Sequence, residues 1–369
     1  MSTYCSIQDS MESNSGIGVT IIRWIVGATF LFSGLTKCID PVGISIYVDK
    51  YLATYGLEAL ISISEPIAVL LSTLELLLGV LLITGVFRCL VSTFSLIIVA
   101  IFTVVTLLSA TILPVGECGC FGDIVPLTPW QTFFKNVVLL VLSFIVWRGS
   151  RTQQRVGVRD VVILVVAIAI PLAINLYALR HLPIVDTMPY KVGTTLYHDV
   201  LKEREMENAS VQNVLIFRNI TTGETVEFDA MDSTCWEDEN LEFVDAKTIE
   251  SHVETTYGEF RLYNVDGEDC SIDILGRRGR VALLCVNDIH AMTDKHRKGL
   301  STLLASYPSH GIVILTSVNR EDVASQLDLR GVELYTIDAM TLRSVIRSDI
   351  GVVVLRDGVV EYKSNIQDI

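Results

Sequence analysis

The segment 70–85, LLSTLELLLGVLLITG, decides the fold class of this chain. A helix needs about 20 mostly apolar residues to cross the hydrocarbon core of a bilayer, and this run reaches that length with its apolar neighbours. Four other segments also qualify. The five predicted spans cover residues 17–36, 61–86, 90–115, 130–147 and 161–179. We therefore predict a multi-pass α-helical membrane bundle in contact with lipid.

Composition divides the chain into two halves. The 369 residues are 50% hydrophobic and only 19% charged, with a mean hydropathy of +0.49, which is too apolar for an ordinary soluble protein. Acidic and basic residues balance up to Pro183, so the whole net charge of −14 lies in the second half. An acidic soluble part argues against nucleic acid as a partner, because phosphate binding requires a basic face.

The loop RGSRTQQRVGVRD fixes the expected orientation. It carries Arg148, Arg151, Arg155 and Arg159 against a single Asp160, and short loops rich in Lys and Arg stay in the cytoplasm. Alternation then places the N-terminus inside, and the Cys118–Cys120 loop and everything after the fifth span outside. We expect a protein of the inner (cytoplasmic) membrane whose C-terminal part is periplasmic.

The loop GECGCFGDIVPLTPWQTF, residues 116–133, contains a Cys-Gly-Cys pair, Cys118 and Cys120. On the oxidising side a disulfide can persist, and a small, exposed ring exchanges more readily than a structural bridge. A redox pair is one interpretation; a structural bridge, two free thiols or half of a metal site are the others. Cys38, expected on the same side, is a candidate resolving thiol or a packing residue.

Three charged side chains lie inside the predicted spans. Glu75 occupies the middle of the second span, where a carboxylate costs about 3 kcal/mol and requires a partner or a proton. Arg23 in the first span and Lys135 in the fourth are the candidate partners. Glu75 could carry protons for chemistry with a quinone, form a buried pair that locks helices together, or serve a solute carrier.

After Pro183 the pattern changes to short strands and helices. NVLIFRNITTGETVEFDA reads as two strands around a turn, and the chain from Gly279 alternates strand and helix until a final hairpin with Asp357 and Gly358 at its turn. We expect a membrane domain at 1–183, a β-rich linker region at 184–275 and an α/β domain at 276–369.

Two resemblances follow from these motifs. FLFSGLTKCIDPVG, LELLLGVLLITGVFR and ECGCFGDIVPLTPWQTFFKN resemble the DoxX-like, MauE-type membrane proteins, whose label is methylamine utilisation. That resemblance implies disulfide chemistry outside the cytoplasm and assigns it to Cys118 and Cys120. The last 90 or so residues resemble a thioredoxin-like domain, but NDIHAM stands where that family has Cys-x-x-Cys, so we expect no redox catalysis there.

Two functions follow as expectations. In the first, Cys118 and Cys120 exchange disulfides with extracytoplasmic client thiols, with a quinone as the candidate electron acceptor. In the second, the bundle anchors a non-catalytic assembly or binding domain. Cys235 and Cys270 are expected to be more exposed than Cys285, which lies in an apolar strand.

Overall fold

The computed structural model describes residues 2–369 with several gaps. It leaves out 113–118, 124, 126, 151–155, 231, 232, 237, 239, 251–255, 308–310 and 328–330. The described chain separates into two compact units, one of residues 1–191, 343–351 and 364–369, the other of residues 192–342 and 352–363. The division at 1–183, 184–275 and 276–369 stays a prediction.

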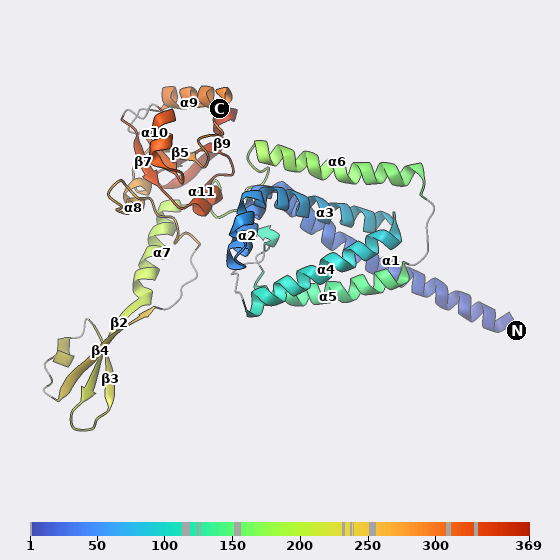
Figure 1. Cartoon of the computed structure of the whole chain (residues 1–369), viewed down its shortest axis with the longest axis horizontal. Coiled ribbons are helices and arrows are strands. Elements are labelled where there is room, and N and C mark those ends of the chain that lie inside the picture. The colour runs from blue at the N-terminus through green and yellow to red at the C-terminus, as the bar shows by residue number, and fades with distance from the viewer. Residues whose placement is uncertain are drawn as a thin grey trace. The chain divides into compact units, whose positions relative to one another are not determined.

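The first unit is a helical bundle (Figure 1). Its long helices are α1 (Ser2–Ile39), α3 (Ser64–Thr84), α4 (Arg88–Thr111), α5 (Pro129–Gly149) and α6 (Val158–Arg180). Each contains a stretch long and apolar enough to cross a membrane, five in the described part of the chain. The predicted membrane bundle is confirmed, and the protein is an integral membrane protein.

Between the first two spans the structure contains elements that the hydropathy pattern did not predict. Helix α2 (Pro41–Thr54) and the 3₁₀ helix η1 (Glu58–Ile63) occupy what the sequence presents as a loop. Asp40 caps α2 by accepting a hydrogen bond from the Gly43 N–H, and proline stands at its first turn, a combination that starts helices efficiently. Several α2 side chains reach the site described below.

Local sequence sets where the spans begin and end. Gly85 adopts φ +71° just after α3 and donates its N–H to the Leu81 carbonyl, a left-handed conformation that glycine tolerates best. Thr128 and Gln131 form a capping box ahead of α5, and Pro129 is its first residue. Pro129 therefore marks the start of the fourth span.

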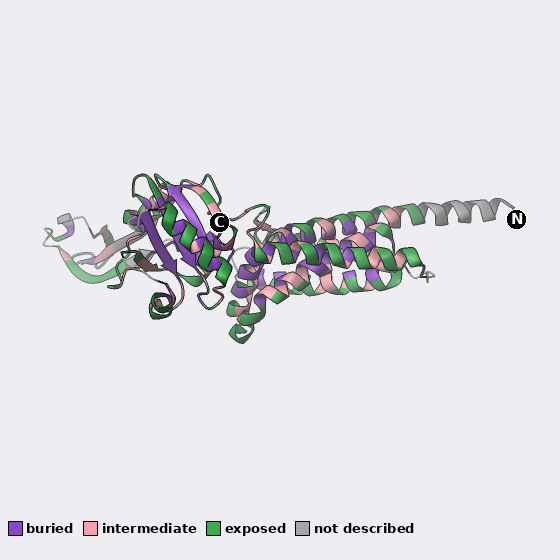
Figure 2. Ribbon diagram, turned by 90° about the horizontal axis from the view of Figure 1, so that it is seen from above, coloured by how far each residue is buried: buried purple, intermediate pink, exposed green. Residues whose placement is uncertain are grey.

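Helices α1 and α3 approach each other at glycines. A Cβ at Gly34 would lie 2.3 Å from the Leu76 backbone nitrogen, and one at Gly79 would lie 2.5 Å from that of Leu31. Small residues allow such close helix packing in membranes. The bundle core beside this contact comprises Val26, Phe30, Leu78, Leu81, Leu82, Val86, Val91, Val99 and Val146. Figure 2 shows exposed residues along the outer faces of the spans, where apolar side chains such as Val138 (58% exposed) would meet lipid.

The second unit contains helix α7 (Leu196–Ser210) and a three-stranded sheet of order β3-β2-β4. The strands are β2 (Val211–Asn219), β3 (Thr225–Asp229) and β4 (Leu241–Glu250). Strands β2 and β3 pair antiparallel, which confirms the predicted hairpin.

The C-terminal fold is thioredoxin-like, a mixed sheet of order β7-β6-β5-β8-β9 with helices. Its strands are β5 (Arg280–Val286), β6 (Ile312–Thr316), β7 (Glu333–Thr336), β8 (Ile350–Arg356) and β9 (Val359–Asn365). Its helices are α8 (Ser271–Leu275), α9 (Asp294–Ser306), α10 (Arg320–Gln326) and α11 (Ala339–Val345), with η4 (Ile366–Asp368) at the end. Strands β5, β6 and β7 are parallel. Asp357 and Gly358 take φ +50° and +78° at the final turn, as a two-residue hairpin of the expected kind requires.

Candidate functional site

Cys120 begins a short strand, β1 (Cys120–Asp123), and is half-buried. Gly119 before it adopts φ +57°, and a Cβ there would lie 2.7 Å from Cγ of Tyr47 in α2. Only glycine satisfies both the dihedral angle and the contact with the tyrosine ring. Cys118 lies outside the described residues. The structure therefore describes how the bundle holds one half of the predicted pair.

A buried polar cluster from two spans holds the backbone of Cys120. Ser33 Oγ lies 2.7 Å from the Cys120 carbonyl oxygen and 2.6 Å from Glu75 Oε2, and its single proton can be donated to one of them at a time. Lys37 Nζ donates to Glu75 Oε2 at 2.6 Å and to Ser33 Oγ at 2.8 Å. We call Ser33, Lys37 and Glu75 the Lys–Glu cluster. It joins the α1–α3 contact to the Cys-Gly-Cys loop.

The partner of Glu75 corrects the sequence-based expectation. Its ion pair is with Lys37, and their side chains are 4% and 9% exposed. Arg23 is not the partner, because it lies fourteen residues earlier in α1, ~21 Å along the helix, and lines a different cavity. A spacing of four residues places Ser33 and Lys37 on one helix face, which is the signal that could have identified them. Lys37 stands near the end of its span, where a lysine normally extends to water.

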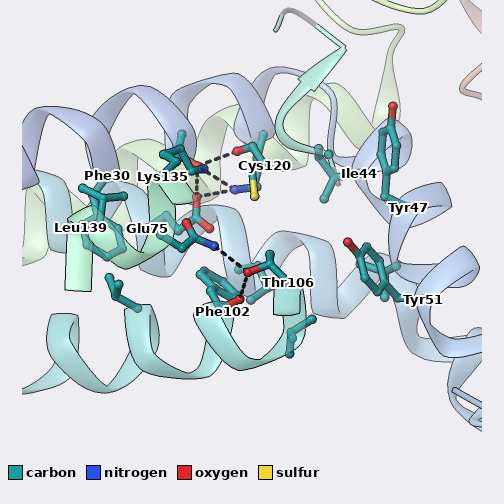
Figure 3. Close-up of a pocket in the computed structure, with 18 of the residues that line it drawn as sticks. Phe30, Ile44, Tyr47, Tyr51, Glu75, Phe102, Thr106, Cys120, Lys135 and Leu139 are labelled. Carbon is teal, nitrogen blue, oxygen red and sulfur yellow. Dashed lines mark hydrogen bonds and ion pairs between the residues drawn. The ribbon is translucent and has the colours of Figure 1, made fainter. Parts of the chain in front are cut away.

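The Lys–Glu cluster forms part of the wall of a cavity of ≈ 260 Å³. Much of the remaining wall is aromatic or aliphatic and includes Phe30, Ile44, Tyr47, Tyr51, Phe102 and Leu139. Lys135, the other candidate partner, also lines it, as do Asn136 and Thr106, which hydrogen bond at 3.3 Å. Figure 3 shows Cys120, Glu75 and Lys135 grouped together, with Tyr47 and Tyr51 farther along the cavity. We call this space the cysteine cavity.

Cys38 occupies a different environment from Cys120. Its side chain is fully buried, and Asn175 Nδ2 in α6 donates to its Sγ at 3.4 Å. Asn175 Oδ1 accepts from Ser72 at 3.2 Å, so the thiol belongs to a polar contact joining α1, α3 and α6. Cys38 does not line the cysteine cavity. Its role as a resolving thiol stays a prediction, and its burial favours the packing alternative.

Of the three cysteines discussed in the second half, Cys235 differs in burial from what the pattern indicated. Cys285 is fully buried, as predicted, and this burial raises its pKa to about 12. Cys235 is 1% exposed, so the expectation that it is accessible is wrong; the 3₁₀ helix η2 (Ser233–Trp236) contains it. Slight desolvation and the carboxylates of Glu268, Asp273 and Asp269 raise the pKa of Cys270. Because the thiolate is the reactive form, these environments disfavour exchange chemistry at Cys270 and Cys285.

Comparisons with known proteins identify the membrane part. Residues 15–149 match the family model described as Methylamine utilisation protein MauE. Protein TlpB of Flavobacterium psychrophilum is 25% identical over 207 residues, an alignment that covers 52% of this chain and 55% of that protein. The chain thus spans about half the length of the curated relative it matches. No solved structure matches it. Over residues 15–149 the membrane bundle is thus similar to the MauE-type proteins, and the chain carries an additional C-terminal domain.

Proposed function

We propose that this protein carries out thiol–disulfide exchange at the membrane surface through Cys118 and Cys120. The observation that carries the proposal is the anchoring of the Cys120 carbonyl by the buried Lys–Glu cluster. A structural staple would not require two buried charges beside it, since such a pair loses several kcal/mol of hydration per ion. The similarity of residues 15–149 to MauE-type proteins supports the proposal, because that resemblance implies disulfide chemistry outside the cytoplasm.

The proposed cycle balances in two steps. In the first, a client dithiol on the outer side attacks the Cys118–Cys120 disulfide; the client becomes a disulfide and the pair becomes two thiols. In the second, the pair passes two electrons and two protons to an acceptor and re-forms its disulfide. The orientation that exposes the pair to an oxidising compartment is part of the proposal, argued from the arginines of residues 148–159.

We propose a lipid-soluble quinone as that acceptor, and the cysteine cavity fits one. An apolar cavity of about 150 Å³ holds a benzene molecule, so ≈ 260 Å³ accommodates a substituted quinone ring. Tyr47, Tyr51 and Phe102 supply aromatic surfaces. The Lys37 ammonium is placed to donate a hydrogen bond to a ring carbonyl oxygen, and Glu75 to exchange a proton at the same place.

The redox state of the pair tests the first proposal. We expect differential alkylation of native membranes to find Cys118 and Cys120 disulfide-bonded, and a reduced two-cysteine peptide to convert them to thiols while the peptide is oxidised. A Cys120→Ser variant should lose peptide oxidation, whereas Cys89→Ser, which changes an exposed cysteine at the start of α4, should retain it. Two permanently free thiols, or equal oxidation by the Cys118→Ser/Cys120→Ser double variant, would favour the non-catalytic binding alternative.

Quinone content tests the second proposal separately. We expect the purified protein to retain quinone extractable by solvent, and Leu139→Trp, which fills the cavity, to lose it. Val138→Trp is the matched control, because that neighbouring side chain is exposed on the outer face. If the pair oxidises peptide thiols but Leu139→Trp and Val138→Trp retain the same amount of quinone, the exchange proposal stands and the cysteine cavity is not the quinone site.

A further inference from the structure

A second cavity, of ≈ 450 Å³, lies in a different part of the bundle. Arg23 of α1, Arg88 at the first residue of α4 and Arg148 in the last turn of α5 line it. Thr20 and Ser150 add hydroxyl groups. We call it the arginine cavity; neither the proposed exchange chemistry nor the family match accounts for it.

The buried arginine of this cavity lacks a complete set of partners. Arg23 is 8% exposed, and its Nε has no hydrogen-bond partner in the described part of the chain. Both Arg23 and Arg88 crowd Gly85, since a Cβ there would lie 2.3 Å from Arg23 Nη1 and 3.1 Å from Arg88 Nε. A guanidinium has five N–H donors and no acceptor. The guanidinium groups of Arg23 and Arg88 both lie next to Gly85, and both line the same cavity with their N–H donors.

Charge in the arginine cavity is unbalanced. No Asp or Glu is among its described lining residues. The positive end of the α4 dipole adds about half a charge, and the negative end of α5 offsets about as much, so a surplus close to three positive charges remains. Like charges at the edge of a low-dielectric region repel one another. An anion bound between them would relieve that repulsion and supply the missing acceptors.

We propose that the arginine cavity binds a phosphate-bearing anion. Arg23 and Arg88 would donate to the phosphate oxygens in the forked geometry that guanidinium and phosphate groups share, and Arg148 would add charge at the rim. The ligand is either the headgroup of an anionic lipid or free phosphate; both have the same recognising chemistry. The site is independent of the cysteine pair.

The test uses the full-length protein in nanodiscs of mixed phosphatidylglycerol and phosphatidylcholine. Native mass spectrometry would count retained lipids for the wild type, Arg23→Gln, Arg88→Gln and the control Arg159→Gln, an exposed arginine at the start of α6. We expect the wild type and the control to retain phosphatidylglycerol selectively, and the other two to bind it at least about tenfold more weakly, because each loses charge-assisted hydrogen bonds. Arg88 is exposed, so its variant carries the test if Arg23→Gln does not fold.

A second measurement distinguishes the two sources of phosphate. If inorganic phosphate, but not chloride at equal ionic strength, raises the unfolding temperature of the wild type and not of Arg88→Gln, with no preference between lipids, free phosphate is the ligand. If Arg88→Gln and Arg159→Gln match the wild type in both lipid retention and phosphate response, the proposal is overturned.

Discussion

At the scale of single residues, a few buried polar atoms govern the site. Glu75 and Lys37 face each other at 2.6 Å between two spans, and Ser33 connects them to the Cys120 backbone. A buried ion pair contributes little net stability, but removing one partner leaves an uncompensated charge. The cluster therefore behaves as a unit, and single substitutions should be far more damaging than a matched double substitution.

Lys37→Met should destabilise the bundle by about 3–5 kcal/mol, since it leaves the Glu75 carboxylate unpaired. The double variant Lys37→Met/Glu75→Leu should recover most of that loss. Unfolding of the purified protein in mixed micelles measures both, and Lys50→Met, at an exposed lysine of α2, is the control. Equal losses in the single and double variants would contradict a charge-pairing role.

Cys285 should resist alkylation at neutral pH in the folded protein. Its pKa of about 12 leaves almost no thiolate, and its side chain is fully buried. Mass spectrometry after brief labelling should find it unmodified until denaturant is added, whereas the exposed Cys89 should react first. Rapid labelling of Cys285 under native conditions would mean that the strand β5 opens readily.

At the scale of elements, the contact between α1 and α3 positions the site. Ser33 and Gly34 are neighbours in α1, so the glycine contact with Leu76 also determines how near Ser33 comes to Glu75. Helix packing in lipid relies on such close approach, because burial in an apolar solvent brings little hydrophobic gain. At Gly34 the absence of a side chain is what permits this approach.

Gly34→Val should separate α1 from α3 and disrupt both bundle stability and the Ser33–Glu75 hydrogen bond. The added side chain would collide with backbone atoms of Leu76, which cannot move independently of the helix. Gly18→Val is the matched control on the same helix, because a Cβ at Gly18 has nothing within 4 Å. Thermal unfolding in detergent should fall for the first variant only; equal unfolding temperatures would refute the contact.

At the scale of the whole molecule, the two units depend on different interactions. The bundle combines lipid-facing apolar surface with a few internal polar contacts, whereas the thioredoxin-like sheet has an apolar core that includes Leu283, Val313 and Val353. The second unit contains partly buried ion pairs, such as Arg277 with Glu333 at 2.6 Å and Arg204 with Asp269 at 2.8 Å. We therefore expect the stability of the second unit to depend on pH.

Acid should weaken the second unit. The hydrogen bond from Arg277 lowers the pKa of Glu333; burial acts to raise the pKa of Asp269, but hydrogen bonds from Ser271 and Arg204 outweigh it and lower the pKa. A carboxyl group with a lowered pKa stabilises the fold above its unfolded pKa, and that contribution disappears as the pH falls through the folded value. We expect stability to decline below about pH 4.

Reaction of Cys285 with a dipyridyl disulfide, a reagent that thiols attack even in acid, reports opening of the sheet. In denaturant, this reaction should be faster at pH values below the ordinary pKa range of carboxyl groups than at neutral pH. Arg277→Ala should remove part of this dependence, about 0.5 kcal/mol, because the pair is partly exposed to solvent. A pH-independent rate of opening would contradict the assignment.

The sequence by itself determined the five spans, the hairpin at Asp357, the α/β character of the second half and the Cys-Gly-Cys loop, because hydropathy, turn residues and short motifs are local properties. Only the tertiary structure decided that Lys37, and not Arg23, neutralises Glu75, that α2 contributes to the cavity beside Cys120, and that Cys235 is buried. Those outcomes depend on which faces of distant helices and strands meet. An unpaired charge inside a membrane is costly, so a charged side chain there pairs with the opposite charge that helix packing brings close to it.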